Sequence, residues 1–169
     1  ASMLAMLDLK EGINPNKSKR KVIGIDIDIR KHNRLAIENH FLANYIELIE
    51  GSSVEVGISE KVHELSKDYK SIMVFLDSNH TEEHVLEELK LYSGLVTLNS
   101  YCVVFDTCIE YLPEGTYQNR SWSVGNNPRT AIKKFCESNN DFIIDKDIDH
   151  KLLISVSKNG YLKKVKEVN

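Results

Sequence analysis

Three aspartates in the chain directly follow runs rich in Val and Ile. The runs read "KVIGID", "SIMVFLD" and "SYCVVFD", and they end at Asp26, Asp77 and Asp106. The carboxyl ends of parallel strands share one sheet edge, and neighbouring strands lie ~4.8 Å apart, so such carboxylates can reach one hard cation or one polar ligand. A lone aspartate after a strand is often only a cap or turn residue. The three together indicate a ligand site.

The segment "MVFLDSNHTEEHV" adds a histidine to this edge. His80 lies three residues beyond Asp77 and is expected to project from the same side of the sheet. A histidine there can take a proton from a hydroxyl that a cation has acidified. Asn79 and Glu82 suit the first turn of a helix, so an exposed first-turn histidine is the alternative interpretation.

The same segment also matches the zinc-protease pattern H-x-x-E-H. His80 and His84 stand one helical turn apart in "HTEEH" and are able to share a metal ion. The match has only three fixed positions, and its first histidine falls at a helix start, so zinc hydrolysis is not favoured. His84 is expected to be a packing or surface residue.

A second group of polar residues follows the first two predicted strands. Asp26 in "GIDID" suits the two hydroxyls of a ribose, because a carboxylate accepts two hydrogen bonds. Read with Asp28 as an Asp-x-Asp pair, the same residues suit the metal and diphosphate of a sugar nucleotide. Gly51, Ser52 and Ser53 either line an adenine pocket or form a turn.

These residues depend on an alternation of strands and helices. Strands are predicted over Lys21–Asp26, Tyr45–Glu50, Ser71–Asp77 and Ser100–Asp106, and helices over Lys31–Asn39, Ile58–Lys67 and Thr81–Tyr92. Continuous apolar runs are typical of strands covered on both faces. The fold class predicted is therefore α/β, a three-layer sandwich with a mostly parallel, doubly wound sheet in a single domain over residues 1–169.

The last third of the chain does not continue this alternation of strands and helices. A long irregular stretch, "EYLPEGTYQNRSWSVGNNP", carries Tyr111, Tyr117 and Trp122, which form either a lid over a substrate or a small satellite core. A helix is predicted from Pro128 to about Ser138. The runs "DFIID" and "KLLISVS" predict a closing antiparallel hairpin.

Composition narrows the class of protein. A net charge of −3 gives no reason to expect nucleic-acid binding, and no apolar run is long enough to cross a bilayer. Three widely spaced cysteines do not form a disulfide framework, so we expect a cytoplasmic, reducing compartment. A small-molecule substrate is expected, and a homo-oligomer is left open. The opening "ASMLAMLDLK" reads as the middle of a helix without a cap, so upstream residues are expected to be missing.

Longer blocks of the sequence resemble a known family. "RKVIGIDIDIRKHNRLAIENH", "LIEGSS", "VFLDSNHTEEHVLEELKLYSGLVTLNSYCVVFDT" and the tail from "NPRTAIKKF" onward are similar to the cephalosporin hydroxylases and the related rhamnosyl O-methyltransferases. The resemblance begins near Lys21 and covers nearly all of the chain after it. It implies a Rossmann-like, S-adenosylmethionine-dependent methyltransferase, in lipid or secondary-metabolite biosynthesis, often with bound Mg²⁺.

The resemblance assigns roles to the residues above. Asp26 corresponds to the ribose-binding acid, Asp77 and Asp106 correspond to the Mg²⁺ ligands, and His80 stands where catechol-type O-methyltransferases have a catalytic lysine. Two departures are visible. Phe105 replaces a glutamate that family members usually carry, and the first strand with its glycine-rich cofactor loop is not in the sequence, so the chain is expected to be incomplete at its N-terminus.

The function predicted is metal-assisted O-methyl transfer to a hydroxyl of a sugar or small polar metabolite. One alternative is a glycosyltransferase that binds a sugar nucleotide through Asp26 and Asp28. Another is a non-catalytic binding domain that has lost the cofactor loop. Nucleotide-diphosphate binding distinguishes the first alternative, and absence of methyl transfer distinguishes the second.

Overall fold

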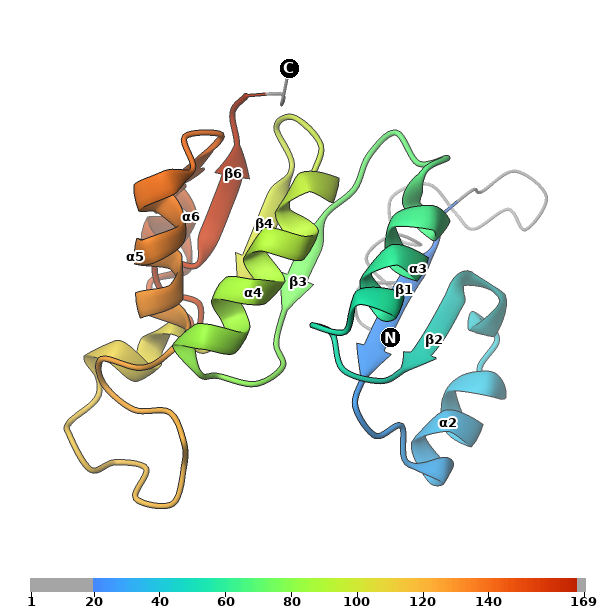
Figure 1. Ribbon diagram of the computed structural model, residues 1–169, viewed down its shortest axis with the longest axis horizontal. Helices are drawn as coiled ribbons and strands as arrows, with labels where there is room; N and C mark the ends of the chain where they lie inside the picture. Colours follow the sequence, from blue (N-terminus) through green and yellow to red (C-terminus); the bar gives the residue numbers. More distant parts are fainter. Residues whose placement is uncertain (1–19, 167–169) are drawn as a thin grey trace. The chain divides into compact units, whose positions relative to one another are not determined.

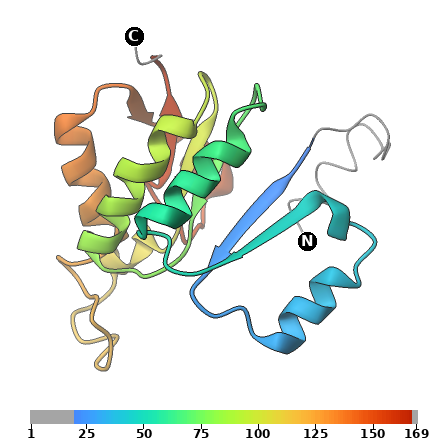
Figure 2. The ribbon, with the colours of Figure 1, turned by 45° about the vertical axis from the view of Figure 1, so that its right-hand side comes forward.

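Two parallel strands joined through a helix make up most of residues 20–50. The computed structural model describes residues 20–166 and divides into two units, residues 1–58 and 59–169, which are described separately. In the first unit β1 (Val22–Asp26), α2 (Lys31–Glu38), a short helix (Ala43–Tyr45) and β2 (Ile46–Glu50) follow one another. β1 and β2 lie side by side in Figures 1 and 2, in a register that sets Asp26 opposite Glu50.

The second unit is built on a four-stranded sheet of order β3-β4-β6-β5. β3 (Val74–Leu76) and β4 (Tyr101–Val104) are parallel, whereas β6 (Tyr161–Lys164) runs antiparallel to β4 and to β5 (Phe142–Ile144). Figure 1 shows α4 (Glu82–Tyr92) and α5 (Pro128–Ser138) side by side in front of this sheet. The remaining helices are α3 (Val56–Ser66), α6 (Lys146–Leu152) and two short ones, Ser93–Leu95 and Thr107–Tyr111.

This arrangement is the α/β, Rossmann-like organisation expected from the sequence. Each predicted strand and helix up to α5 is present, with ends shifted by a few residues at most. The core of the second unit lies between the sheet and α4 with α5, where Leu89, Ile132 and Leu162 are completely buried. α5 starts as predicted at Pro128, behind Asn127, whose side-chain oxygen accepts hydrogen bonds from the backbone of Arg129 and Thr130.

The closing hairpin differs from the prediction in one of its two strands. β5 forms within "DFIID", but the partner is "YLKK" of β6 and not "KLLISVS". That run instead completes α6, which begins behind Asp145 as its cap, and continues into a turn in which Leu153 has φ 63° and Ile154 is 92% exposed. The apolar residues of "KLLISVS" suggested a strand. β6, however, is the segment that alternates buried and half-exposed side chains, as a paired strand does.

The turn before β6 packs tightly against the end of β4. Gly160 accepts a hydrogen bond from the Val104 amide at 2.9 Å, and the hydroxyl of buried Thr107 donates to the Lys158 carbonyl at 2.7 Å. A Cβ atom at Gly160 would overlap the Val104 carbonyl oxygen and stand 2.9 Å from the Ser157 carbonyl oxygen. A glycine is therefore required here because the two backbones approach so closely.

Gly160→Ala is expected to destabilise the protein by about 1–3 kcal/mol, the usual cost of overpacking. The measurement is urea unfolding followed by circular dichroism. Gly94→Ala is the control, since a Cβ there meets nothing within 4 Å. Equal stability of the two variants would contradict the close approach at Gly160.

The three cysteines form no disulfide, as predicted. Cys102 lies in β4 and is fully buried, and this burial, reinforced by the negative charge of Glu88, raises the pKa of its thiol to about 12. Burial also raises the pKa of the half-buried Cys108 and Cys136. Only the thiolate is a strong nucleophile, so all three are expected to be poorly reactive.

Native protein at pH 8 should therefore leave Cys102 unmodified by iodoacetamide. A pKa of about 12 keeps all but roughly one thiol in 10,000 protonated at that pH. Peptide mass spectrometry before and after addition of urea measures the modification, and the unfolded chain is the internal control. Rapid native labelling of Cys102 would show that β4 is not covered as described.

Among residues 20–166, no helix has both the length and the apolar character needed to span a membrane.

Candidate active site at the ends of β3 and β4

The parallel pairing of β3 with β4 places two of the predicted acids at one edge. Leu76 pairs with Val104, and the amide of Phe105 donates to the Leu76 carbonyl at 2.9 Å as the last hydrogen bond of the ladder. Asp77 and Asp106 leave the sheet immediately beyond this point. Asp106 has φ 53°, a left-handed conformation uncommon for residues other than Gly, Asn and Asp and frequent at functional sites.

His80 completes a cluster with these acids. Its Nε2 lies 2.8 Å from Asp106 Oδ2 and 3.7 Å from Asp77 Oδ1. One potential ligand atom from each of the three residues lies within 4.8 Å of the others. The His80 Nε2 is buried, and its contact with Asp106 is close but not aligned as a hydrogen bond, so the nitrogen has no hydrogen-bond partner among the described residues.

The spacing fits the coordination shell of a divalent cation. Ligands ~2.1 Å from an octahedral ion are ~3.0 Å apart when adjacent and ~4.2 Å apart when opposite, close to the separations in the cluster. His80 Nε2 and Asp106 Oδ2 lie close together without a hydrogen bond between them, as two ligands of one ion do. Carboxylates suit Mg²⁺ and Mn²⁺, and an added imidazole favours Mn²⁺ and other transition metals over Mg²⁺.

The alternative metal pair of His80 and His84 is not assembled. His84 Nε2 faces Glu88 Oε1 at 3.6 Å on the same helix, whereas His80 faces the two aspartates. His84 is not among the residues that form the cation cluster in the described part of the chain. The structure therefore supports the packing interpretation of His84.

The long loop after the cluster contributes an aromatic wall. Trp122 packs edge-to-face on the His80 ring with centroids 5.3 Å apart, and Tyr117 packs on Trp122 at 4.6 Å. Tyr111 lies elsewhere, where its hydroxyl accepts a hydrogen bond from the Asn159 side chain at 2.9 Å. Of the three aromatic residues proposed for a lid, two therefore gather beside His80.

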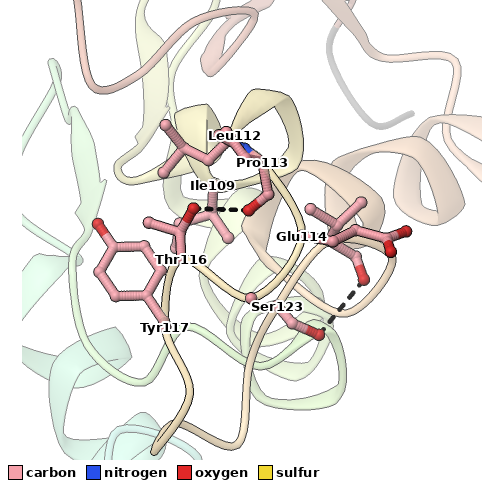
Figure 3. A pocket seen from close by; sticks show the side chains of 9 residues that line it. Ile109, Leu112, Pro113, Glu114, Thr116, Tyr117 and Ser123 are labelled. Carbon is pink, nitrogen blue, oxygen red and sulfur yellow. Dashed lines mark hydrogen bonds between the residues drawn. The ribbon is translucent and has the colours of Figure 1, made fainter.

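The same loop borders an open cavity of about 250 Å³, shown in Figure 3. The side chains of Ile109, Leu112 and Tyr117 supply its apolar wall, and the Thr116 hydroxyl donates to the Pro113 carbonyl at 2.6 Å. Tyr117 lines this cavity and packs on Trp122, which packs on His80. Two aromatic rings therefore lie between the cavity and the cluster.

The base of this loop is fixed by exposed and partly buried polar contacts that sequence reasoning missed. Glu110 Oε2 accepts hydrogen bonds from the Gly125 amide and the Asn127 side chain. Asn126 Oδ1 accepts from the Glu82 amide at 3.0 Å and so joins the loop to the start of α4. The pair of asparagines before Pro128 was the available signal, since such residues commonly cap helices.

The predicted cofactor residues gather in the first unit. Asp26 is exposed at the end of β1; its Oδ1 accepts from the Asp28 amide at 3.0 Å, and its carbonyl accepts from the Gly51 amide at 2.9 Å. Gly51 has φ 146°, and a Cβ there would stand 3.0 Å from Ile58 Cδ1, so a glycine is needed. Ser52 and Ser53 follow it directly.

Phe105 stands where a family glutamate was expected. Its half-buried ring lies 6.3 Å from the ring of Phe75, so this position supplies an apolar contact and no oxygen ligand. His80 Nε2 is the third potential ligand in the described cluster, in addition to the two aspartates. Asp77 and Asp106 are therefore the carboxylates that the described cluster offers a cation, and residue 105 adds none.

With these strands and helices, the chain has an α/β fold of the Rossmann-like class. It belongs to the family described as "Rhamnosyl O-methyltransferase/CmcI", whose sequence profile matches residues 1–165. This confirms the resemblance seen in the sequence.

Curated relatives and solved structures extend the comparison. Rhamnosyl O-methyltransferase of Mycobacterium bovis is 32% identical over 116 residues, 68% of this chain and 45% of the relative. The Mycobacterium leprae protein of the same name is 33% identical over 88 residues, 52% and 36% of the two chains. This chain thus spans less than half the length of the relatives. MycE methyltransferase, solved with Mg and SAH, aligns with a TM-score of 0.44 at 17% identity, over 69% of this chain and 30% of that one, too weak a likeness to bear on function.

Asn127→Ala is expected to destabilise the protein by about 1–2 kcal/mol, because it removes the cap of α5. The substitution also leaves the half-buried Glu110 without one of its two hydrogen-bond donors, so the loop that carries Trp122 should loosen. Thermal unfolding and limited proteolysis of the loop are the measurements. Asn119→Ala, in the exposed part of the same loop, is the control and should match the parent protein.

Proposed function

We propose that this chain carries the metal-binding and cofactor-binding residues of an S-adenosylmethionine-dependent O-methyltransferase. The observation that supports it most is the convergence of Asp77, His80 and Asp106 at one strand edge, in a chain that belongs to a family described by O-methyl transfer. The names of the mycobacterial relatives support a sugar hydroxyl as acceptor. The acceptor class proposed is a sugar or another small polar metabolite.

Each residue of the cluster has a part in this proposal. Asp77 and Asp106 would hold a divalent cation, which when bound supplies Lewis acidity that orients and acidifies the acceptor hydroxyl. In this proposal His80 is not a ligand of the cation: its Nε2, 2.8 Å from Asp106 Oδ2, accepts the hydroxyl proton, directly or through one water. Trp122, packed on the His80 ring, shields that nitrogen from bulk solvent.

The transfer itself is a displacement at the methyl carbon. The deprotonated acceptor oxygen forms a bond to the methyl group, the carbon–sulfur bond of the sulfonium breaks, and its electron pair goes to sulfur. Placing the oxygen in line with that bond is the main contribution of the protein, because orientation removes much of the entropic cost.

Asp26, Asp28 and the 51–53 turn are proposed as the ribose and adenine contacts of the methyl donor. The exposed Asp26 carboxylate keeps acceptor capacity beyond its bond to the Asp28 amide. Gly51 lets the backbone come close to a ligand at the end of the neighbouring strand. We further infer a cytoplasmic protein, on the ground of the three free cysteines.

Calorimetry with S-adenosylhomocysteine, with and without Mn²⁺ or Mg²⁺, tests the cofactor assignment. We expect heat of binding from the parent protein and at least tenfold weaker binding by Asp26→Ala, since the ribose loses its carboxylate partner. Binding of a nucleoside diphosphate sugar in place of S-adenosylhomocysteine would favour the glycosyltransferase alternative. Binding of neither would favour a non-catalytic domain.

Asp77→Asn and Asp106→Asn should each lower methyl transfer by about 10- to 100-fold, because they remove a charged ligand of the cation. Asparagine keeps the left-handed backbone at position 106 accessible, so the fold is retained. Asp68→Asn, an exposed aspartate outside the cluster, is the matched control. Turnover that is unchanged in both cluster variants would refute the metal-assisted mechanism and leave the cofactor assignment standing.

A further inference from the structure

One ionisable side chain near the cluster lies in the interior and has no place in the mechanism above. Glu88, in the second turn of α4, is only 2% exposed, and its Oε2 has no hydrogen-bond partner within residues 20–166. Withdrawing a carboxyl group from water costs several kcal/mol unless it is paired. The position therefore calls for an explanation other than packing, which an apolar residue of similar size would provide at lower cost.

The partner of Glu88 leads directly to the cluster. Glu88 Oε1 accepts a hydrogen bond from the Ser78 hydroxyl at 2.7 Å, and His84 Nε2 lies 3.6 Å from the same oxygen. Ser78 is the residue after Asp77 and lies two residues before His80. The bond therefore links the middle of the segment 77–80 to the rigid body of α4.

The rest of this segment has few other anchors. Asn79 Oδ1 accepts from the Thr81 amide, a bond within the turn itself, and the next tie to the fold is the Glu82 amide on Asn126. Asp77 and Ser78 are exposed. His80 contacts Asp106 and Trp122, and the Ser78–Glu88 bond is the contact that joins this segment to a buried side chain of α4.

The surroundings of Glu88 keep it in place. Cys102 on β4 and Tyr92 on α4 both lie near enough that the negative charge of Glu88 adds to burial in raising the pKa of each to about 12. Neither group carries a positive charge, so these two neighbours do not neutralise the acid. At 2% exposure the Glu88 carboxylate has few alternative positions, and a hydrogen bond to such a fixed acceptor restricts the Ser78 donor.

We propose that Glu88 is a positioning residue: through the Ser78 hydroxyl it sets the place of Asp77 and His80 relative to Asp106. This inference rests on the metal-assisted transfer proposed above, and it adds a residue that touches neither substrate nor cation. Residues that hold metal ligands in this way typically contribute 10- to 100-fold to metal affinity.

The test uses the only tryptophan of the chain, Trp122, as a reporter that needs no ligand. Its ring contacts His80, so its fluorescence emission responds to movement of the 77–80 segment. Mn²⁺ binding, followed by electron paramagnetic resonance, is the second measurement, and thermal unfolding is the third. Ser66→Ala is the matched control, because Ser66 is buried and its hydroxyl donates within α3 to Val62 at 2.7 Å.

Ser78→Ala should shift the Trp122 emission and weaken Mn²⁺ binding by about tenfold, with no greater loss of melting temperature than the control. Glu88→Gln keeps an acceptor oxygen for Ser78 and should retain both the emission and, within about twofold, the Mn²⁺ affinity. Unchanged emission in Ser78→Ala would overturn the proposal. A shifted emission in a protein whose parent form binds no Mn²⁺ would sustain the positioning role and refute the metal-assisted function.

Discussion

The candidate site depends on one constraint, the parallel pairing of β3 with β4. Parallel strands that pair in register bring their carboxyl ends to the same edge, so residues 29 positions apart in the sequence become neighbours. The last ladder bond, from the Phe105 amide to the Leu76 carbonyl, is immediately followed by Asp77 on one strand and Asp106 on the other. This pairing brings Asp106 to the segment that holds Asp77 and His80.

Helix α4 turns this strand edge into a site with defined geometry. Its first amide donates to Asn126 of the loop that carries Trp122, and its second turn carries Glu88, which accepts a hydrogen bond from Ser78. The carboxylate of Glu82 pairs with Lys134 of α5, and this hydrogen bond keeps the pKa of Glu82 below its usual value. The pair is exposed enough that its contribution to stability is small. Buried contacts near the strand ends therefore matter more than charges on the helix surface.

The first unit follows the same architectural rule with a different chemistry. Asp26 ends β1, and Gly51, with positive φ, follows the neighbouring strand β2. The Gly51 amide donates a hydrogen bond to the Asp26 carbonyl. A carboxylate beside a closely approaching backbone suits hydroxyl groups and flat rings better than it suits a cation. These residue types are the reason why we propose the first unit for the cofactor contacts and the second unit for the cation ligands.

The sequence by itself determined the α/β class, the strands that end in aspartate, the start of α5 and the absence of disulfides, because apolar runs, Pro128 and cysteine spacing act locally. It did not determine the partner of β5: "KLLISVS" has a strand-like composition, but the alternation of a paired strand belongs to "YLKK". Which residues touch His80, and that Glu88 holds Ser78, was decided only by tertiary structure. Contacts between segments distant in sequence arise from packing and register, which no local pattern of letters encodes.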